Sequence, residues 1–363
     1  MKKSIDVAII GLGARGGDVY GPLINNRKDE FNIVALCDKR TDRLKRFAIE
    51  FGVDKKNCFL LEEEFFKEKR ADFLVIATPD LAHIGHLYKA MPLGYDILVE
   101  KPVCEKEEDC KKLLSLQKKY SKKVFVCHVI RYAPAFVKLG ELLARQRIGK
   151  LISVDALERV EYAHYSHSYV RGNWRNTDVA MPMILAKCCH DLDLIQYYAG
   201  AKCVSVSSIG ENTFFNKENA PDDSADRCLN CKYADDCVFS AKKIYLDRWE
   251  NASCPTDIWP FNVIAEAPLT EEKIIIALKT GDYGRCVFKC DNNVVDHQIT
   301  LMNFANGVKA TLNMSAFTNY GGRRYAFFGT EGEIIYDEQN DSILVRRFGE
   351  AEERVKLADF VKD

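Results

Sequence analysis

Short apolar runs alternate with amphipathic stretches along the first part of the chain. The runs are rich in β-branched residues and have the length of buried strands, while the stretches between them have helical periodicity. Strands that alternate with helices in this way predict βαβ units, and therefore a parallel, doubly wound sheet. The predicted strands cover residues 4–10, 31–38, 71–80, 95–100 and 124–132, and the clearest predicted helices cover 41–52 and 104–123.

The pattern changes after a predicted helix at 133–149. Strand-like segments then follow one another, several with alternation of apolar and polar residues, and few helices lie between them. Asn306-Gly307 between two of these segments is a strong hairpin signal. This succession predicts a mostly antiparallel sheet, accompanied by one helix at 181–200. An open sheet has a face that must be covered, so we expect a homo-oligomer formed through it.

Length and composition set the frame for these elements. A chain of 363 residues suggests two domains at about 150 residues each. The change of pattern divides it at 1–127 and 128–363, with a polar, strand-poor insertion at about 213–260. The chain has 47% apolar residues and a net charge of −1, which indicates neither a nucleic-acid nor a membrane partner. Asp6 interrupts the first apolar run, so we expect no export signal and a cytoplasmic protein with reduced cysteines.

Three glycines follow the first predicted strand in the spacing G-x-G-x-x-G. Gly11 allows a tight turn, Gly13 lets the backbone approach a pyrophosphate, and Gly16 lets the next helix pack close to the strand. Glycines in this spacing also occur by chance in turns, so the context decides. Since a strand precedes them, the loop that includes Ala14 and Arg15 is a predicted dinucleotide-binding loop.

Asp38 ends the second predicted strand, about 20 residues after the glycines. An acidic residue at this place hydrogen-bonds the ribose hydroxyls of a bound dinucleotide. Lys39 and Arg40 follow directly. The favoured interpretation is that both side chains are solvated surface charges. The alternative is that they bind a 2′-phosphate of the cofactor. The predicted cofactor is therefore NAD or NADP, with NAD favoured.

Two further predicted strands end in residues that suit a binding site. One ends in Thr78-Pro79-Asp80 and precedes a helix that carries His83, and the other ends abruptly in Glu100-Lys101-Pro102. In an open parallel sheet, ligands bind just beyond the carboxyl ends of the strands. A lysine ammonium at that place can donate to a substrate oxygen. The alternative interpretation of Lys101 is a surface lysine before a turn.

The segments G-L-G-A-R-G, A-T-P-D-L-A-H and V-E-K-P, with Asp38 between the first two, resemble the Gfo/Idh/MocA family of NAD(P)-dependent oxidoreductases. The resemblance covers essentially the whole chain. It implies a Rossmann fold for the first domain and an α/β domain with a large, open, mostly antiparallel sheet for the second. It also implies that Lys101 binds near the nicotinamide and the substrate hydroxyl. The cofactor contacts that follow from it are Thr78, Pro79, His83 and Glu100.

The helix predicted in the second domain carries another group of reactive side chains. Lys187, His190 and Asp191 stand at i, i+3 and i+4 and therefore lie close together; an exposed polar face with an ordinary ion pair is the alternative. The resemblance implies that His190 exchanges the proton of the substrate alcohol, with Asp193 completing a His-x-x-Asp pattern. The family commonly has an acid four residues before this histidine, where this chain has Ala186. That departure argues against a simple sugar dehydrogenase and suggests a variant subgroup.

A polar, aromatic-rich stretch at 164–178 is predicted to be a loop before this helix. A surface loop is one interpretation. The other is a resemblance to a family segment that passes the nicotinamide and the substrate. Under the second interpretation, His167 and Trp174 are predicted substrate contacts, together with Lys187 and Asp191.

Three of the 14 cysteines, Cys228, Cys231 and Cys237, have the spacing C-x2-C-x5-C within the polar insertion. Thiolates this close suit a structural zinc ion, which takes four ligands, and Cys254 is a candidate for the fourth. A set of free thiols in a loop is the alternative. A redox pair is less favoured, since no thioredoxin-like βαβ unit surrounds the C-x-x-C.

Together these residues predict an NAD(P)-dependent dehydrogenase or reductase that acts on a hydroxyl/carbonyl pair of a sugar, a polyol or a related small polar molecule. Lys101 would polarise the oxygen and His190 would take or give its proton, so both side chains are expected to converge on one cleft. Two alternatives stay open. One is a dinucleotide-binding sensor without turnover, and the other is an eliminase or epimerase that recycles its NAD.

Overall fold

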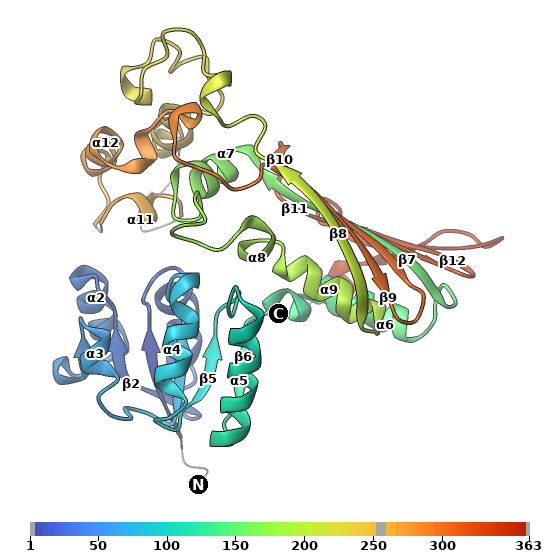
Figure 1. The fold of residues 1–363 in the computed structure, drawn as a ribbon, viewed down its shortest axis with the longest axis horizontal. Coiled ribbons are helices and arrows are strands. Elements are labelled where there is room, and N and C mark those ends of the chain that lie inside the picture. The colour runs from blue at the N-terminus through green and yellow to red at the C-terminus, as the bar shows by residue number, and fades with distance from the viewer. Residues whose placement is uncertain (1–3, 252–258, 267, 361–363) are drawn as a thin grey trace. The chain divides into compact units, whose positions relative to one another are not determined.

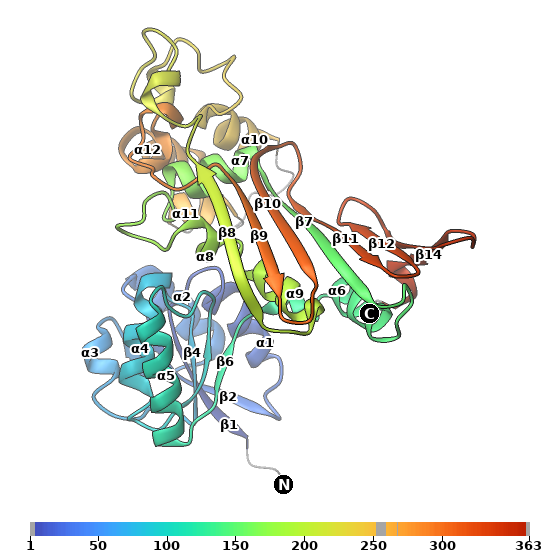
Figure 2. The same cartoon turned by 45° about the vertical axis from the view of Figure 1, so that its right-hand side comes forward.

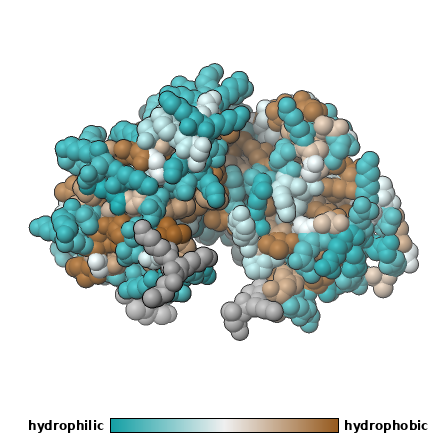
Figure 3. All heavy atoms as spheres, turned by 90° about the horizontal axis from the view of Figure 1, so that it is seen from below, coloured by the Kyte–Doolittle hydropathy of each residue, from teal (hydrophilic) through white to brown (hydrophobic). Residues whose placement is uncertain are grey.

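The computed structural model describes residues 4–251, 259–266 and 268–360. The chain forms two compact units, here called unit 1 (Met1–His128) and unit 2 (Val129–Asp363), each with its own sheet and core (Figure 1). Hydrophilic and hydrophobic residues are interspersed on the face shown in Figure 3. No helix in the described residues combines the length and the apolar character needed to cross a membrane.

Unit 1 is built on a six-stranded sheet with the order β3-β2-β1-β4-β5-β6. All neighbouring strands are parallel, which confirms the predicted doubly wound sheet. The last strand is shorter than the predicted 124–132, because Val129–Tyr132 form a 3₁₀ turn. The strands are Ile5–Ile10 (β1), Phe31–Cys37 (β2), Cys58–Phe59 (β3), Phe73–Ile76 (β4), Asp96–Val99 (β5) and Val124–Val126 (β6).

Both faces of this sheet are buried. Ala8 and Ile10 of β1 belong to the core on one face, and Val7 and Ile9 belong to the core on the other. Burial on both faces explains why the strands form continuous apolar runs in the sequence. A π-helical turn at Gly16–Tyr20 follows β1. The helices are Gly21–Asn25 (α1), Thr41–Phe51 (α2), Glu62–Phe65 (α3), His83–Ala90 (α4) and Glu107–Tyr120 (α5).

Unit 2 contains an eight-stranded sheet with the order β14-β13-β12-β11-β7-β10-β9-β8. Every neighbouring pair is antiparallel except β7 and β10, so the predicted mostly antiparallel sheet is confirmed. The strands are Leu151–Glu161 (β7), Cys203–Glu211 (β8), His297–Phe304 (β9), Lys309–Thr318 (β10), Gly322–Gly329 (β11), Gly332–Asp337 (β12), Ser342–Arg347 (β13) and Glu353–Lys356 (β14).

One face of the unit 2 sheet is covered by α6 (Pro134–Ala144) and α9 (Cys189–Ala199), as Figures 1 and 2 show. The opposite face leaves apolar residues such as Ile299 and Leu301 of β9 exposed, which accounts for the alternation in the sequence. The predicted hairpin joins β9 to β10, with Gly307 at a φ of +93° and the Asn306 side chain accepting a hydrogen bond from the Val308 amide.

Two predictions about the helices of unit 2 are wrong. The helix predicted at 181–200 is divided into α8 (Met183–Ala186) and α9 by Lys187 and Cys188. The loop predicted at 164–178 begins instead with buried helical turns, α7 (Tyr162–Tyr165) and a π-helical segment (Ser166–Arg171). Its polar and aromatic side chains find partners in the insertion, which the local sequence does not reveal. The remaining helices are a π-helical segment (Lys242–Asp247), α10 (Arg248–Glu250), α11 (Phe261–Ile264) and α12 (Glu271–Thr280).

Candidate functional site

The glycine loop follows β1 at the carboxyl edge of the unit 1 sheet. Gly11 has a φ of +89°, and a Cβ at this residue would lie 2.5 Å from the carbonyl oxygen of Ala77. A Cβ at Gly16 would lie 1.9 Å from the carbonyl oxygen of Gly11. A Cβ at Gly13, by contrast, would meet only a guanidinium nitrogen of Arg43, at 3.5 Å. The first and third glycines are therefore required by packing, while the second leaves the backbone open to a ligand.

Asp38 directly follows β2 and is buried beside this loop. Its Oδ2 accepts a hydrogen bond of 2.6 Å from the backbone amide of Leu12, and its Oδ1 accepts one of 2.8 Å from the amide of Arg40. A carboxylate has about four acceptor positions, so it can bind further hydroxyl groups. Lys39 is exposed, and the guanidinium of Arg40 holds Asp42 through bonds of 3.0 and 2.6 Å.

His83, the first residue of α4, links the ends of β4 and β5. Its Nδ1 lies 2.7 Å from the carbonyl oxygen of Pro102, and its Nε2 lies 2.8 Å from the carbonyl oxygen of Thr78. The ring is buried at 1% exposure. His83 therefore holds the Thr78-Pro79 and Lys101-Pro102 segments together, and its predicted contact with a cofactor stays a prediction.

Glu100 connects the end of β5 to the helical turn after the glycine loop. Its buried carboxylate accepts a hydrogen bond of 2.5 Å from the Tyr20 hydroxyl and lies 3.7 Å from Nε of Arg15. It also accepts a bond of 3.1 Å from the backbone amide of Lys101. Burial and the Glu100 carboxylate both raise the pKa of Tyr20, which keeps this phenol protonated as the donor. Lys101 is thus fixed beside the predicted dinucleotide loop, and its side chain is partly exposed.

In unit 2, a fully buried glutamate lies in the middle of β7. The Oε1 of Glu158 lies 3.1 Å from Nζ of Lys187, and its Oε2 lies 2.9 Å from a guanidinium nitrogen of Arg323. Burial raises the pKa of the Glu158 carboxyl to about 7; Asp191 adds to the rise, and the two cations oppose it. The Lys187 side chain is 20% exposed, while the side chains of Glu158 and Arg323 are 0% and 9% exposed. Lys187 is therefore the member of this group that a ligand can reach.

Asp191, in the first turn of α9, fastens this helix to β11. Its Oδ1 accepts hydrogen bonds of 2.8 Å from Nε of Arg323 and 3.0 Å from the Tyr325 hydroxyl. The side chain is fully buried. Direct contact with a substrate would require these bonds to break, so we expect Asp191 to position α9 rather than to bind the substrate.

His190 stands at the amino-terminal end of α9, and its side chain is buried to 7% exposure. The break after α8 places Lys187 at the same end of the helix. Asp193, three residues further on, holds the guanidinium of Arg131 through two bonds of 2.6 Å. The carboxylate of the His-x-x-Asp pattern thus anchors α9 to the segment before α6.

The segment from 164 to 178 lies against the insertion. His167 is buried, its Nδ1 lies 2.8 Å from the Tyr245 hydroxyl, and its ring stacks on Tyr283 with centroids 4.8 Å apart. Burial lowers the pKa of His167 to about 3, so its ring is neutral near pH 7. His164 has a pKa lowered to about 4 by burial and by the Lys187 ammonium. Its position near Lys187 makes it a second candidate for the surroundings of a substrate.

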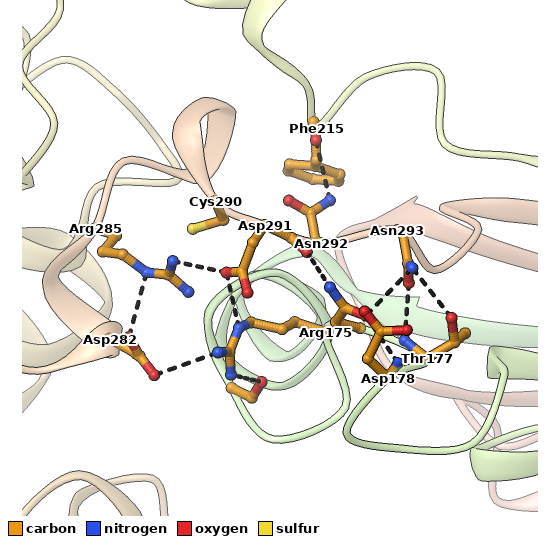
Figure 4. A network of polar contacts seen from close by, with 12 residues as sticks. Arg175, Thr177, Asp178, Phe215, Asp282, Arg285, Cys290, Asp291, Asn292 and Asn293 are labelled. Atoms are coloured by element: carbon orange, nitrogen blue, oxygen red, sulfur yellow. Dashed lines mark hydrogen bonds and ion pairs between the residues drawn. The ribbon is translucent and has the colours of Figure 1, made fainter.

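Trp174 ends this segment with a partly exposed indole ring whose centroid is 6.2 Å from that of Tyr169. Arg175 follows it, and its Nε donates a hydrogen bond of 2.9 Å to Oδ1 of Asp291 (Figure 4). This bond attaches the segment to the chain that follows Cys290. The predicted substrate contact of Trp174 therefore belongs to a segment that is firmly held, and it stays a prediction.

The three predicted zinc ligands, Cys228, Cys231 and Cys237, line one small cavity in the insertion. Cys254 lies outside the described residues. In the part of the chain that the structure describes, no group of three His, Cys, Asp or Glu side chains is already arranged as a metal centre. The zinc site stays a prediction at this point.

Sequence models of one protein family match nearly the whole chain. The description "Oxidoreductase family, NAD-binding Rossmann fold" applies to residues 5–128, and "Oxidoreductase family, C-terminal alpha/beta domain" applies to residues 140–359. The chain belongs to the Gfo/Idh/MocA family. As a Gfo/Idh/MocA protein it is an NAD-binding oxidoreductase, and the resemblance of its motifs to this family is confirmed.

Two relatives within the Gfo/Idh/MocA family show similarity at low sequence identity. The putative oxidoreductase YteT of Bacillus subtilis (strain 168) is 22% identical over 350 residues, which cover 92% of this chain and 77% of YteT. An inositol 2-dehydrogenase of Corynebacterium glutamicum (strain R) is 27% identical over 207 residues. That alignment covers 57% of each chain, so this chain spans little more than half of the dehydrogenase.

Solved structures share the fold of this Gfo/Idh/MocA chain. Levoglucosan dehydrogenase in complex with NADH has a TM-score of 0.68 at 15% identity, over 98% of this chain and 80% of that one. An aldose-aldose oxidoreductase from Caulobacter crescentus complexed with glycerol has a TM-score of 0.66 at 14% identity, over 98% and 84%. At such identities the likeness shows a common fold.

Glu158 is not among the residues predicted from the sequence, although its strand carries a signal for it. Along β7 the inward positions are Val154, Ala156, Glu158 and Val160, all of them buried. A charged residue at an inward position of an alternating strand must have a partner, because an unpaired buried charge is costly. The partner residues Lys187 and Arg323 come from distant segments, so the pattern indicates the need for them but not their identity.

Proposed function

We propose that this protein is an NAD(P)-dependent dehydrogenase or reductase that interconverts a hydroxyl and a carbonyl group of a sugar, a polyol or a related small polar molecule. The observation that carries this proposal is the position of Lys101. It is the second residue after β5, at the carboxyl edge of the sheet, and Glu100 ties it to the helical turn after the glycine loop. Ligands of a Rossmann fold bind beyond this edge.

The residues of the glycine loop fit a dinucleotide. The backbone at Gly13, where a Cβ would meet only the Arg43 guanidinium at 3.5 Å, would receive the pyrophosphate, and the spare acceptor positions of Asp38 would receive the ribose hydroxyls. NAD is favoured over NADP, since Arg40 is occupied by Asp42. When bound, the nicotinamide supplies the acceptor or donor of hydride.

The protein's own groups handle the substrate oxygen and its proton. Lys101 donates a hydrogen bond to the oxygen, which stabilises the charge that develops there. His190 takes the hydroxyl proton during oxidation and returns it during reduction. Where the family commonly has an acid this chain has Ala186, and the next residue, Lys187, paired with Glu158, places a partly exposed ammonium at the same end of α9 as His190. Relatives named inositol 2-dehydrogenase support a polyol or sugar as the substrate class.

The experiment is a turnover assay of the full chain with NAD and NADP against a panel of sugars and polyols. Lys101→Met and His190→Asn are each expected to lower kcat by about 10²- to 10⁴-fold. The matched controls are Lys39→Met, which removes an exposed lysine after another strand, and His297→Asn, which removes a partly exposed histidine of β9. Both controls are expected to keep the wild-type rate.

A double variant tests whether the two residues act together. If Lys101 and His190 serve one transition state, Lys101→Met/His190→Asn loses far less than the product of the single losses. Wild-type turnover in both single variants would disprove the mechanism. Tight NADH binding without turnover on any substrate would favour the sensor instead. Product formation without net NADH formation would favour an eliminase or epimerase.

A further inference from the structure

A small cavity of about 30 Å³ lies where the insertion of unit 2 meets residues 286–288. Four cysteines and an arginine are among the residues that line it: Cys228, Cys231, Cys237, Cys286 and Arg171. Three of these cysteines form the C-x2-C-x5-C pattern. The fourth, Cys286, belongs to a distant segment of the sequence and is brought to the cavity by the fold.

The backbone around the cavity places two of these cysteines on adjoining, bridged chain segments. Arg227 and Arg285 form an antiparallel bridge, so the residues that follow them, Cys228 and Cys286, lie on neighbouring chain segments. The amide of Cys286 donates a bond of 2.8 Å to the carbonyl of Asp226, which reinforces the bridge. Cys231 closes the turn after Cys228 through a bond of 3.1 Å between its amide and the Cys228 carbonyl.

The charge of Arg171 is the second observation that points to a ligand. This guanidinium is fully buried at 0% exposure. One of its terminal nitrogens donates to the carbonyl of Phe239 at 2.7 Å and lies 3.4 Å from Sγ of Cys228, and Nε donates to the carbonyl of Arg285. The other terminal nitrogen has no hydrogen-bond partner, and no carboxylate within the described residues forms an ion pair with it.

The neighbouring Arg285, by contrast, is paired with carboxylates, as a buried arginine usually is. It lies 2.7 Å from Asp291 and 3.6 Å from Asp282, and both carboxylates also hold Arg175 (Figure 4). A buried cation without a counter-charge is costly. Because acidic side chains do not supply the counter-charge of Arg171, the cysteines that surround it are the groups able to do so, as thiolates.

We propose that Cys228, Cys231, Cys237 and Cys286 bind one zinc ion as four thiolates, and that Arg171 compensates the charge of this centre. Four thiol protons leave when Zn²⁺ binds, so the centre carries a net charge of −2 and attracts the guanidinium. The four sulfurs must draw together to Zn–S distances of about 2.3 Å. The tetrahedral set is complete without Cys254.

Four cysteine sulfurs at tetrahedral positions suit either zinc or an iron–sulfur cluster. The four cysteines together supply the complete ligand set of a structural zinc site, and metal analysis distinguishes zinc from iron. The zinc ion would hold the insertion, whose Tyr245 hydroxyl lies 2.8 Å from Nδ1 of His167.

The test measures the metal content of the full chain by elemental mass spectrometry, after purification without chelators. We expect about one zinc per chain in the wild type. Cys286→Ser and Cys237→Ser are expected to lose it. The matched controls are Cys290→Ser, whose thiol donates to the Cys286 carbonyl at 3.2 Å, and Cys254→Ser; both are expected to retain zinc.

A wild type that contains no zinc and binds none when it is added would overturn the proposal, as would iron in its place or zinc retained in Cys286→Ser. Alkylation of the wild-type protein provides a measurement that does not depend on variants that fold poorly. Removal of zinc by a chelator is expected to increase the modification of the four proposed ligands selectively. Equal modification of these cysteines with and without chelator would refute the site.

Discussion

Replacement of Glu158 by glutamine tests whether a buried carboxyl in unit 2 holds a proton near neutral pH. The pKa of Glu158 is raised from 4.5 to about 7 in the folded protein, first by burial and then by Asp191. The folded protein therefore binds this proton more tightly than the unfolded chain does. The stability linked to the proton is fully present below pH 4.5 and is lost as the pH rises through about 7.

The two pKa values set the size of the effect. The difference between 4.5 and about 7 corresponds to about 3 kcal/mol in the free energy of unfolding. Between about pH 5 and about pH 8, we expect the free energy of unfolding of the wild type to fall by roughly 2–3 kcal/mol more than that of Glu158→Gln. The glutamine variant lacks this slope because its amide does not titrate.

Urea unfolding followed by tryptophan fluorescence measures this difference. All three tryptophans, Trp174, Trp249 and Trp259, belong to unit 2, so the signal reports on the unit that contains Glu158. Glu331→Gln is the control, since this glutamate is exposed and is expected to keep the wild-type slope. An equal pH slope in Glu158→Gln and the wild type would refute the reasoning. It would mean that Lys187 and Arg323 keep the carboxylate ionised throughout.

Three further predictions concern the cofactor, the hairpin and the sheet. Asp38→Asn is expected to raise KM for NAD by about tenfold, because a charged acceptor for the ribose hydroxyls is lost. Steady-state kinetics with NAD and NADP measure this effect, and an unchanged KM for both cofactors would contradict it. Gly307→Ala is expected to destabilise the β9–β10 hairpin by about 1 kcal/mol, since alanine resists a φ of +93°; an unchanged midpoint of thermal unfolding would count against it. We also propose that the protein is a homo-oligomer formed through the exposed face of the unit 2 sheet. The double variant Ile299→Lys/Leu301→Lys on this face is expected to be monomeric in analytical ultracentrifugation. The control Ile49→Lys, which changes an exposed residue of unit 1, is expected to keep the oligomer. A monomeric wild type would refute this interface.

The parts of the site that the sequence predicts well are those that depend on neighbours along the chain. Gly11 and Gly16 are identified by a spacing that a single strand–turn–helix requires, and the structure gives each a close backbone neighbour. Asp38 follows its strand directly, and Lys101 follows another. In each case one local element both carries the residue and fixes its place at the edge of the sheet.

The parts that the sequence predicts poorly depend on contacts between distant segments. Helical periodicity continues from Met183 through Ala199, yet the helix breaks at Lys187, whose ammonium pairs with Glu158 of β7. Periodicity records which face of a segment is apolar, and it does not record a partner that comes from another strand. Buried ion pairs of this kind are therefore invisible until the strands are placed side by side.

The sequence by itself determined the parallel and antiparallel sheets and the hairpin at Asn306-Gly307, and it predicts the dinucleotide loop, because each follows from short-range periodicity or from backbone freedom at a glycine. Only the tertiary structure decided that Glu158 pairs with Lys187, that His167 packs against Tyr245 of the insertion, and that Cys286 lines the same cavity as the three clustered cysteines. These contacts arise from the packing of distant segments, where burial forces charges and polar groups to find partners whatever their separation along the chain.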